Sequence, residues 1–261
     1  MGNRILLFGS GGFVGSYLKY NLEVVPITRT DCNLLDEKSV NSLLKKYTPD
    51  IVINSACNID LSLDNFNNKC FIDNIKIFSN FYNNKNLFHK FINIGSGAEF
   101  DRTHSIDFVK EYDILNVIPK DHYGLSKNII SRICLQTENF YTIRLFGCLH
   151  HTDKKRLFNK ILNEDNISIK NRKFDYFCLE DLIPVLQYFI SEEFPIKDVN
   201  LVYKEKCFLK QIIENFCIIH NINRKINYVD VDINYTGSSE LIDSLGLDFI
   251  GLQRGLEKYI I

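Results

Sequence analysis

The sequence ILLFGSGGFVGS at residues 5–16 decides the fold, because a short apolar run leads into glycines that recur at every third position. This order predicts a buried strand, a tight turn and the start of a helix. Glycines let the backbone approach a pyrophosphate closely, and the helix N-terminus offers free N–H groups and a partial positive charge. We interpret the stretch as a dinucleotide-binding loop; the alternative is a turn that only packs helix against strand. The residues expected to contact the dinucleotide here are Gly9, Gly11, Gly12, Phe13, Val14 and Gly15.

Short apolar runs and amphipathic stretches alternate through the rest of the first half. The runs are continuously apolar, as expected of parallel strands that are buried on both faces. Strands are predicted at 4–8, 24–28, 51–54, 90–94 and 141–145, and helices near 13–22, 37–47, 63–84 and 121–138. This alternation predicts an α/β fold, here a Rossmann-like doubly wound parallel sheet.

The alternation weakens after about residue 147. Further helices are predicted near 153–163, 179–191, 206–219 and 238–246, and the polar segment 97–119 is predicted to be a long functional loop. We predict a dinucleotide-binding domain over 1–150 that carries the catalytic residues. A smaller substrate-binding lobe is predicted over 151–261, from which a segment near 174–190 returns to the first domain.

The composition excludes several classes of protein. The 261 residues are 45% hydrophobic and 24% charged with a net charge of -1, which gives no electrostatic footprint for nucleic acid or an anionic membrane. No apolar run approaches the roughly 20 residues of a membrane span, and the N-terminus does not resemble a signal peptide. The eight cysteines form no C-x-x-C pair, so neither a metal site nor a disulfide framework is expected. We expect a soluble, cytoplasmic protein.

The residues after the second predicted strand bear on the type of dinucleotide. The stretch is TRTDCNLLD, with Arg29 first after Thr28 and Asp31 two positions later. An acidic residue at this strand end binds the ribose 2′-hydroxyl of NAD, whereas an arginine accommodates the 2′-phosphate of NADP. We therefore favour NADP(H) over NAD(H) as the cofactor. The alternative for Arg29 is a solvated loop charge.

A second motif is DHYGLSKNII at residues 121–130, in which Tyr123 precedes Lys127 by four positions. Residues at i and i+4 share one face of a helix, so both side chains can point at one ligand. By itself, a tyrosine four positions before a lysine is weak evidence for a catalytic pair, because an amphipathic helix surface also produces this spacing by chance. Ser96 adds a hydroxyl at the end of the strand predicted at 90–94, where open α/β sheets bind ligands.

Jointly these motifs resemble the extended short-chain dehydrogenase/reductase family, of the NAD-dependent epimerase/dehydratase type. The resemblance extends from residue 4 to about residue 185 and is closest in outline to GDP-fucose synthase-like reductases of 4-keto sugar nucleotides. It rests on the glycine loop, PDIVINSAC at 49–57, Ser96, the Tyr123 and Lys127 pair, and IRLFGC at 143–148.

The resemblance implies roles for individual residues. Ser96, Tyr123 and Lys127 would form a catalytic trio, and Tyr123 and Lys127 would also contact the cofactor. Further cofactor contacts are implied for Asn33, Leu34, Ser55, Ala56, Cys57, Asn74 and Leu145. The family often dimerises through the helices predicted near 63–84 and 121–138, so a homodimer is expected.

The chemistry of the trio suits ketone reduction. Hydride addition turns a carbonyl into an alkoxide, so the site needs an acid near neutral pH. The ammonium of Lys127 is expected to lower the pKa of the Tyr123 phenol, and Ser96 to hydrogen-bond the substrate oxygen. The alternative to a catalytic role is a turn residue for Ser96 and an ordinary amphipathic helix surface for Tyr123 and Lys127.

The residues that follow Ser96 narrow the choice among the reactions of the family. Family dehydratases follow the hydroxyl residue with an Asp-Glu pair, but Gly97 and Ala98 stand there. Epimerase-reductases place a cysteine at Ala98 and a histidine near Arg156, and neither is present. What remains is reduction of a 4-keto-6-deoxy hexose or heptose carried on a nucleoside diphosphate. The alternatives are a 4-epimerase that holds NAD tightly and a non-catalytic dinucleotide-binding scaffold.

Other residues depart from the family pattern. Gly147 replaces an asparagine, and Phe174 replaces an arginine that reads the diphosphate. Arg172, Lys173, Lys170 or Arg156 are candidates to supply that charge, and His150 and His151 are candidates for the substrate mouth or a surface turn. The candidate contacts to the nucleotide-diphosphate sugar are Gly97, Ala98, Glu99, Gly147, Arg156 and Arg172.

Overall fold

The centre of the molecule is a six-stranded parallel sheet in the order β10-β6-β4-β3-β1-β2. The computed structural model describes residues 3–59, 68–153, 157–164, 166–193 and 195–260. The strands of the sheet are β1 (Ile5–Phe8), β2 (Val25–Ile27), β3 (Ile51–Asn54), β4 (Lys90–Ser96), β6 (Phe140–Leu145) and β10 (Asp198–Leu201). The first five confirm the predicted strands, whereas β10 was not predicted.

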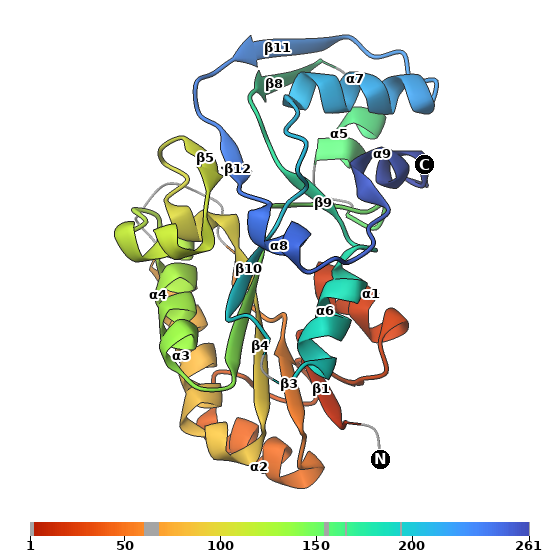
Figure 1. Cartoon of the computed structure of the whole chain (residues 1–261). Coiled ribbons are helices and arrows are strands. Elements are labelled where there is room, and N and C mark those ends of the chain that lie inside the picture. Colours follow the sequence, from red (N-terminus) through yellow and green to blue (C-terminus); the bar gives the residue numbers. More distant parts are fainter. Residues whose placement is uncertain (1–2, 60–67, 154–156, 165, 194, 261) are drawn as a thin grey trace.

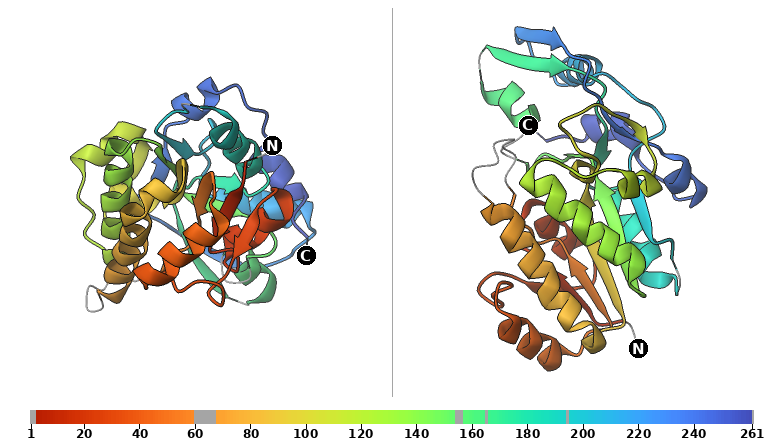
Figure 2. Two further views of the ribbon diagram at one scale, coloured as in Figure 1. Left: turned by 90° about the horizontal axis from the view of Figure 1, so that it is seen from below. Right: turned by 90° about the vertical axis from the view of Figure 1, so that its left-hand side faces the viewer.

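Helices cover both faces of the sheet (Figure 1). One face carries α1 (Phe13–Asn21) and α6 (Leu182–Ser191), and the other carries α2 (Glu37–Tyr47), α3 (Lys69–Asn83) and α4 (His122–Gln136). Figure 2 shows α3 and α4 side by side on their face.

The strand residues alternate between the two layers of helices. In β1, Ile5 and Leu7 join the α1 and α6 side, while Leu6 and Phe8 join the α2, α3 and α4 side. Every residue of this strand is therefore buried, which explains why the strands read as continuous apolar runs. The predicted Rossmann-like doubly wound sheet is confirmed.

A smaller lobe lies beyond the carboxyl ends of the sheet strands (Figure 1). It contains the parallel pair β8 (Ile167–Asn171) and β11 (Ile226–Asp230) with α5 (Leu157–Asn163), α7 (Leu209–Ile219) and α9 (Gly251–Glu257). Its core includes the rings of Phe158, Phe216 and Tyr259, which contact one another edge-on or tilted. The chain returns from this lobe to the sheet through α6 and β10.

Shorter elements link the longer helices and strands. They are η1 (Lys85–Leu87), η2 (Gly97–Phe100), η3 (Glu111–Asn116), β5 (Ile106–Val109), β7 (Gly147–Leu149), β9 (Tyr176–Cys178), β12 (Tyr235–Gly237) and α8 (Glu240–Ser244). Four of them form two small parallel pairs, β5 with β12 and β7 with β9. The segment 97–119 is therefore not one long loop, because η2, β5 and η3 lie within it.

The predicted helices are confirmed where the structure describes them. The expected helix near 63–84 begins in residues outside the described ranges, and its described part is α3. Of the helix expected near 153–163, Asp153 is described and is not helical, residues 154–156 lie outside the described ranges, and the described helical part is α5. The seven-residue helix α9 and the short strands of three to five residues were not predicted, because segments of this length carry too little periodicity. Among the described residues, no helix is long and apolar enough to cross a membrane.

Candidate active site and cofactor cleft

The cleft begins where the order of strands reverses. β2 lies on one side of β1 and β3 on the other, so the loops that follow β1 and β3 meet at their carboxyl ends. Ser55 fastens the two loops, because its backbone N–H and its hydroxyl donate to the Phe8 carbonyl at 3.0 and 2.7 Å. In open α/β sheets such a reversal is where nucleotides bind.

The glycine loop after β1 has the shape that a pyrophosphate needs. Gly9 has φ +77°, and a Cβ there would lie 2.5 Å from the backbone nitrogen of Ala56. A Cβ at Gly15 would collide with the Gly9 carbonyl, so α1 packs against the loop only with glycine there. Gly12 caps α1 without a side-chain hydrogen bond, as at helix N-termini that bind phosphate through backbone N–H groups. The residues here fit a dinucleotide phosphate.

After β2, the two charged residues that bear on the choice of cofactor, Arg29 and Asp31, differ in their surroundings. Asp31 folds back on Thr28, whose N–H and hydroxyl donate to its carboxylate at 2.8 and 2.5 Å and lower the pKa of Asp31. Arg29 is exposed. Asn33 is also exposed and uses its side-chain oxygen to accept from the Leu35 N–H. One carboxylate oxygen of Asp31 is thus engaged within the loop itself.

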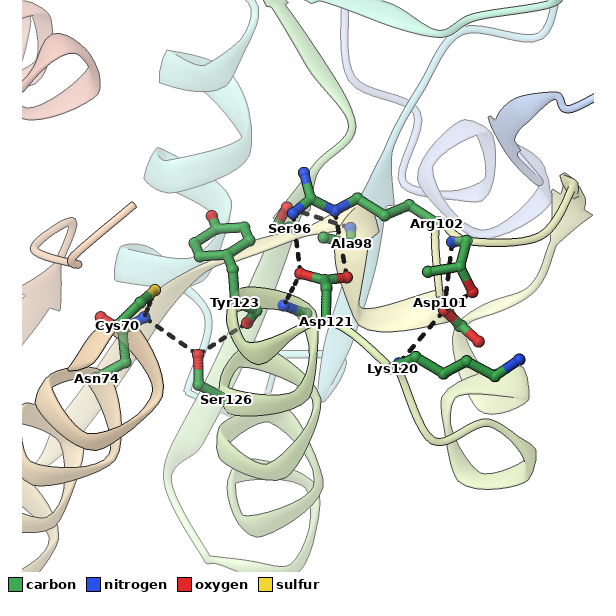
Figure 3. Close-up of polar contacts among 12 residues, drawn as sticks. Cys70, Asn74, Ser96, Ala98, Asp101, Arg102, Lys120, Asp121, Tyr123 and Ser126 are labelled. Atoms are coloured by element: carbon green, nitrogen blue, oxygen red, sulfur yellow. Dashed lines mark hydrogen bonds and ion pairs between the residues drawn. The ribbon is translucent and has the colours of Figure 1, made fainter. Parts of the chain in front are cut away.

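Asn74 has a different role from the cofactor contact that was expected of it. The side chain is buried at 3% exposure and is engaged inside the protein. It accepts from the Asn58 N–H at 2.7 Å, and it donates to the Asn58 carbonyl at 3.0 Å and to Ser126 at 3.1 Å. Figure 3 shows its bond to Ser126 on α4. Asn74 thus fixes the loop after β3 against α4.

The predicted trio comes together between β4 and α4. Ser96 ends β4, and Tyr123 and Lys127 occupy the first two turns of α4. Their exposed fractions are 9%, 8% and 3%, so all three are buried. Asp121 caps α4 by accepting from the Gly124 N–H at 2.8 Å.

Arg102 braces the start of α4 (Figure 3). It grips Asp121 through two bonds, of 2.9 and 3.2 Å, and its guanidinium carbon lies 5.8 Å from the Tyr123 ring centre. Sequence reasoning did not identify Arg102. Its bidentate contact holds the carboxylate that caps the helix of Tyr123.

The pKa of Tyr123 contradicts the expected effect of Lys127. It is raised well above its ordinary value, chiefly by burial and then by the neighbouring Cys57 thiol, while a hydrogen bond with Ser96 opposes the rise. The Lys127 ammonium instead donates to the Ile94 carbonyl at 2.6 Å. The phenol therefore keeps its proton at neutral pH, as a proton donor must.

Glu99 does not face a substrate, contrary to the expectation of a sugar contact. Its side chain is fully buried and pairs with the fully buried Arg144. It also accepts from the Ser96 N–H at 2.8 Å and from the Ser131 hydroxyl at 2.7 Å. A carboxylate this deeply engaged has no oxygen to offer a sugar. Its effect is to fix the turn that carries Ser96.

Gly147 is also closed to the substrate that was expected to reach it. A Cβ at this position would collide with the Phe174 ring and would lie 2.7 Å from the Asp175 carbonyl oxygen. The two departures from the family pattern are therefore linked, because the ring of Phe174 occupies the space that a side chain at 147 would need. Ala98 is buried at 2% exposure and packs in a cluster with Tyr123 and Cys70.

Arg172 is the most promising of the candidate cations. Its guanidinium lies 5.3 Å from the Phe174 ring centre, and burial lowers its pKa. Within the part of the chain that the structure describes, its buried Nε has no hydrogen-bond partner. Lys170 is exposed, and Lys173 lies over the Phe108 ring at 5.5 Å. Arg156 lies outside the described residues.

The histidine pair lies against α1. His150 contacts Tyr17 edge-on, with the ring centres 4.9 Å apart, and its ring centre lies 4.1 Å from that of His151 in a tilted arrangement. Burial and then His151 lower the pKa of His150 to about 4, so its ring is neutral at pH 7. No group of three or more metal-ligating side chains occurs among the described residues.

Tyr235 is a site residue that sequence reasoning missed. It reaches the trio from β12, and a Cβ on Gly97, the neighbour of Ser96, would lie 2.8 Å from its hydroxyl. The side chain is 7% exposed. No motif surrounds it in the sequence, because contacts with distant segments bring it here: β12 pairs with β5, and Tyr235 forms a bridge with Phe174.

Several solved structures share this fold at low sequence identity. The GDP-mannoheptose C4 reductase MlghC from Campylobacter jejuni, with NADP bound, matches with a TM-score of 0.83 at 18% identity, over 99% of this chain and 97% of that one. The dTDP-4-dehydrorhamnose reductase from Bacillus anthracis, in complex with NADP, gives 0.82 at 14%, over 99% and 98%. A GDP-L-fucose synthetase from Naegleria fowleri gives 0.81 at 15%, over 98% and 91%.

Structures at such low identity show the fold but not the family, so the family is assigned from a sequence model of the family. No curated protein matches the sequence. The model of the NAD dependent epimerase/dehydratase family matches residues 5–149, more than half of the chain, from the start of β1 to the end of β7. With its glycine loop at the strand reversal and its Ser, Tyr and Lys side chains gathered beside it, the chain belongs to the NAD dependent epimerase/dehydratase family.

Proposed function

We propose that the protein is an NADP(H)-dependent reductase of a nucleotide-linked 4-keto-6-deoxy sugar, a hexose or a heptose, with hydride delivered to C4. The observation that carries this proposal is the meeting of Ser96, Tyr123 and Lys127 beside the glycine loop. Solved proteins with the same fold, named as reductases of GDP-heptose and dTDP-sugar ketones, support the substrate class.

The residues have distinct tasks in such a reduction. The chemistry that a bound reduced nicotinamide supplies is a hydride for the carbonyl carbon. Tyr123 donates its phenolic proton to the carbonyl oxygen, and burial keeps that proton in place until the oxygen becomes basic. Ser96 hydrogen-bonds the same oxygen. The Lys127 ammonium donates to the Ile94 carbonyl at 2.6 Å and so ties α4 to the strand that ends at Ser96.

The residues that follow Ser96 provide no second acid or base for the reaction. This favours hydride transfer alone, without elimination of water and without epimerisation at the carbons next to the ketone. Gly97 and Ala98 carry no acidic or basic group, and Glu99 is committed to Arg144 and to the Ser96 backbone. Proton abstraction from a carbon needs a base within hydrogen-bonding reach. The immediate neighbours of Ser96 offer none.

Two cations support the choice of cofactor and substrate. Arg29 is exposed after β2, while the Asp31 carboxylate is engaged by Thr28, which favours a 2′-phosphate over a free ribose hydroxyl. Arg172 carries a buried Nε that the described residues leave unpartnered, and its charge acts on Tyr235. We assign Arg172 to the sugar-nucleotide diphosphate, in place of the arginine replaced by Phe174.

The test is incubation with NADPH and a panel of 4-keto sugar nucleotides. We expect loss of NADPH absorbance and a single C4 alcohol. Tyr123→Phe should lower kcat by about 100-fold to 10,000-fold with NADPH binding retained, because it removes only the proton donor. The matched control is Tyr112→Phe, which removes a hydroxyl from a side chain that is 62% exposed and should leave kcat unchanged.

The other outcomes identify the alternatives. Absence of NADPH oxidation with every ketone overturns the reductase proposal. If tightly bound NAD copurifies and C4 epimers interconvert without net oxidation of NADPH, the protein is a 4-epimerase. If wild type and Tyr123→Phe bind the dinucleotide equally and neither converts any sugar, the protein is a binding scaffold.

A further inference from the structure

The turn that follows Ser96 lies against the start of α4. The helix η2 follows Ser96 directly, and Tyr123 is the second residue of α4. A Cβ on Gly124 would lie 2.5 Å from the Ala98 carbonyl oxygen, so the first turn of α4 touches the turn of Ser96. The distance between the Ser96 and Tyr123 hydroxyls therefore depends on how these two segments are joined.

Arg102 and Asp121 join the two segments. Arg102 lies two residues beyond the end of η2, and Asp121 is the residue that caps α4. The guanidinium donates to both carboxylate oxygens, from Nε at 3.2 Å and from a terminal nitrogen at 2.9 Å (Figure 3). The side chains are 17% and 1% exposed, so the pair is largely shielded from water. Two parallel bonds between planar groups fix orientation as well as distance.

The Asp121 carboxylate passes this constraint to the helix. The oxygen Oδ1, which accepts from the terminal nitrogen of Arg102, also accepts from the Gly124 N–H at 2.8 Å. The Asp121 carbonyl accepts from the Leu125 N–H at 2.9 Å. Tyr123 lies between these anchored positions, and its ring centre is 5.8 Å from the Arg102 guanidinium carbon. A shift of the Asp121 carboxylate therefore moves the turn that carries Tyr123.

A second carboxylate joins the same two segments in the opposite direction. Asp101 precedes Arg102 and is 6% exposed. Its Oδ1 accepts from the Thr103 N–H at 3.2 Å and the Thr103 hydroxyl at 2.6 Å, and from the Lys120 N–H at 3.4 Å. Residues 101 and 102 thus contact residues 120 and 121, with an acceptor on each side. This double connection holds the two segments in one defined arrangement.

Other side chains hold the rest of α4. The Lys127 ammonium donates to the Ile94 carbonyl of β4, and the Asn128 amide donates to the Glu99 carbonyl of η2 at 2.8 Å. These contacts do not involve Arg102. We therefore expect α4 to stay docked on β4 and η2 when Arg102 is replaced, with only its first turn released.

We propose that Arg102 is a positioning residue that acts through Asp121: the pair sets the separation between the Ser96 and Tyr123 hydroxyls at which both reach one carbonyl oxygen. This inference rests on the proposed ketone reduction, in which Ser96 hydrogen-bonds the oxygen that Tyr123 protonates. Such a separation matters for the rate, because a misplacement of about 1 Å costs about 100-fold in catalysis.

The first test is Arg102→Gln, which removes the charge and the bidentate contact. We expect kcat for ketone reduction to fall on the order of 10-fold to 100-fold, with the KM for the sugar nucleotide and the dissociation constant of NADPH little changed. An unchanged kcat overturns the inference.

The matched control is Arg4→Gln. Arg4 also holds a helix end, because its guanidinium donates to the Tyr47 carbonyl in the last turn of α2 at 2.5 Å. It precedes β1 and so lies at the opposite end of the parallel sheet from Ser96. Its kcat should equal that of the wild type, and a fall as large as that of Arg102→Gln contradicts a specific role of Arg102.

A double-mutant cycle separates the positioning of Tyr123 from stabilisation of the fold. In Tyr123→Phe no hydroxyl is left to position, so the addition of Arg102→Gln should have little further effect on the residual kcat. A residue that merely stabilises the fold would lower kcat by the same factor in both backgrounds, and that result overturns the inference.

Asp121→Asn tests the route from Arg102 to the helix. Asparagine caps a helix about as well as aspartate does, but it cannot form the ion pair. We expect kcat to fall to the level of Arg102→Gln, and the double variant to be no slower than either single variant. Additive losses contradict an action of Arg102 through Asp121.

A conservative substitution guards against loss of folding. Arg102→Lys keeps the cation beside Asp121 but cannot form two parallel bonds. Its midpoint of urea denaturation should stay near that of the wild type, while its kcat remains below the wild-type value. A wild-type kcat in Arg102→Lys would show that charge alone suffices and would overturn the inference. Absence of turnover by the wild type itself would instead refute the reductase proposal.

Discussion

Gly147 and Phe174 show how two unusual residues can explain each other. Each departs singly from the family pattern, and no motif in the sequence connects them. In the structure, the Phe174 ring fills the space next to Gly147 and also supports Tyr235. The Phe174 ring can therefore occupy this position only because residue 147 has no side chain.

This pairing predicts a compensating effect on stability. Gly147→Ala should lower the free energy of unfolding by about 1–3 kcal/mol, because the new methyl group overlaps the Phe174 ring and the Asp175 carbonyl. Phe174→Leu frees part of that space, so the double variant should lose less than the sum of the single losses. Urea denaturation measures all three. Strictly additive losses would show that the two residues are independent.

At the scale of elements, the short helix η2 is the best example of a site built by distant partners. Ser96 and Glu99 bracket the turn, and Glu99 reaches Arg144 on β6, which also pairs with Asp198 on β10 at 2.6 Å. The motif around Ser96 identified the hydroxyl. It could not show that Glu99 is internal, because its partners are far away in the chain.

We predict that Glu99→Gln is strongly destabilising. It leaves the buried Arg144 guanidinium with one carboxylate instead of two, which should cost about 3–5 kcal/mol of unfolding free energy. The control is Glu240→Gln, which removes a surface pair with Lys110 and should leave the free energy of unfolding nearly unchanged. Denaturant titration compares them, and equal losses would refute the assignment of Glu99 to a buried ion pair.

At the scale of the whole molecule, the two layers of helices leave one apolar stripe on the outside of α3. Ile72 is 50% exposed, and Ile75 and Tyr82 continue the stripe into a groove that Ile133 of α4 also lines. The resemblance to the family implies a homodimer through these two helices. The stripe gives that expectation a physical basis, because burying apolar area drives association.

The expected dimer can be tested by sedimentation. Ile72→Glu places a charge in the stripe and should raise the dimer dissociation constant at least about 10-fold. Ile218→Glu is the control, because Ile218 is 76% exposed on α7, away from α3 and α4, and should leave association unchanged. A wild-type monomer, or equal effects of the two substitutions, would contradict the dimer.

Local periodicity and spacing encode five of the six sheet strands, the flanking helices, the glycine loop and the trio motifs, so the sequence was enough to predict them. The tertiary fold was needed to show which polar residues are internal and which face the site. Glu99 and Asn74 bind groups far away in the chain, and Tyr235 reaches the turn of Ser96 through contacts with distant segments, β5 and Phe174. Such contacts depend on long-range packing, and no local pattern in a single sequence records them.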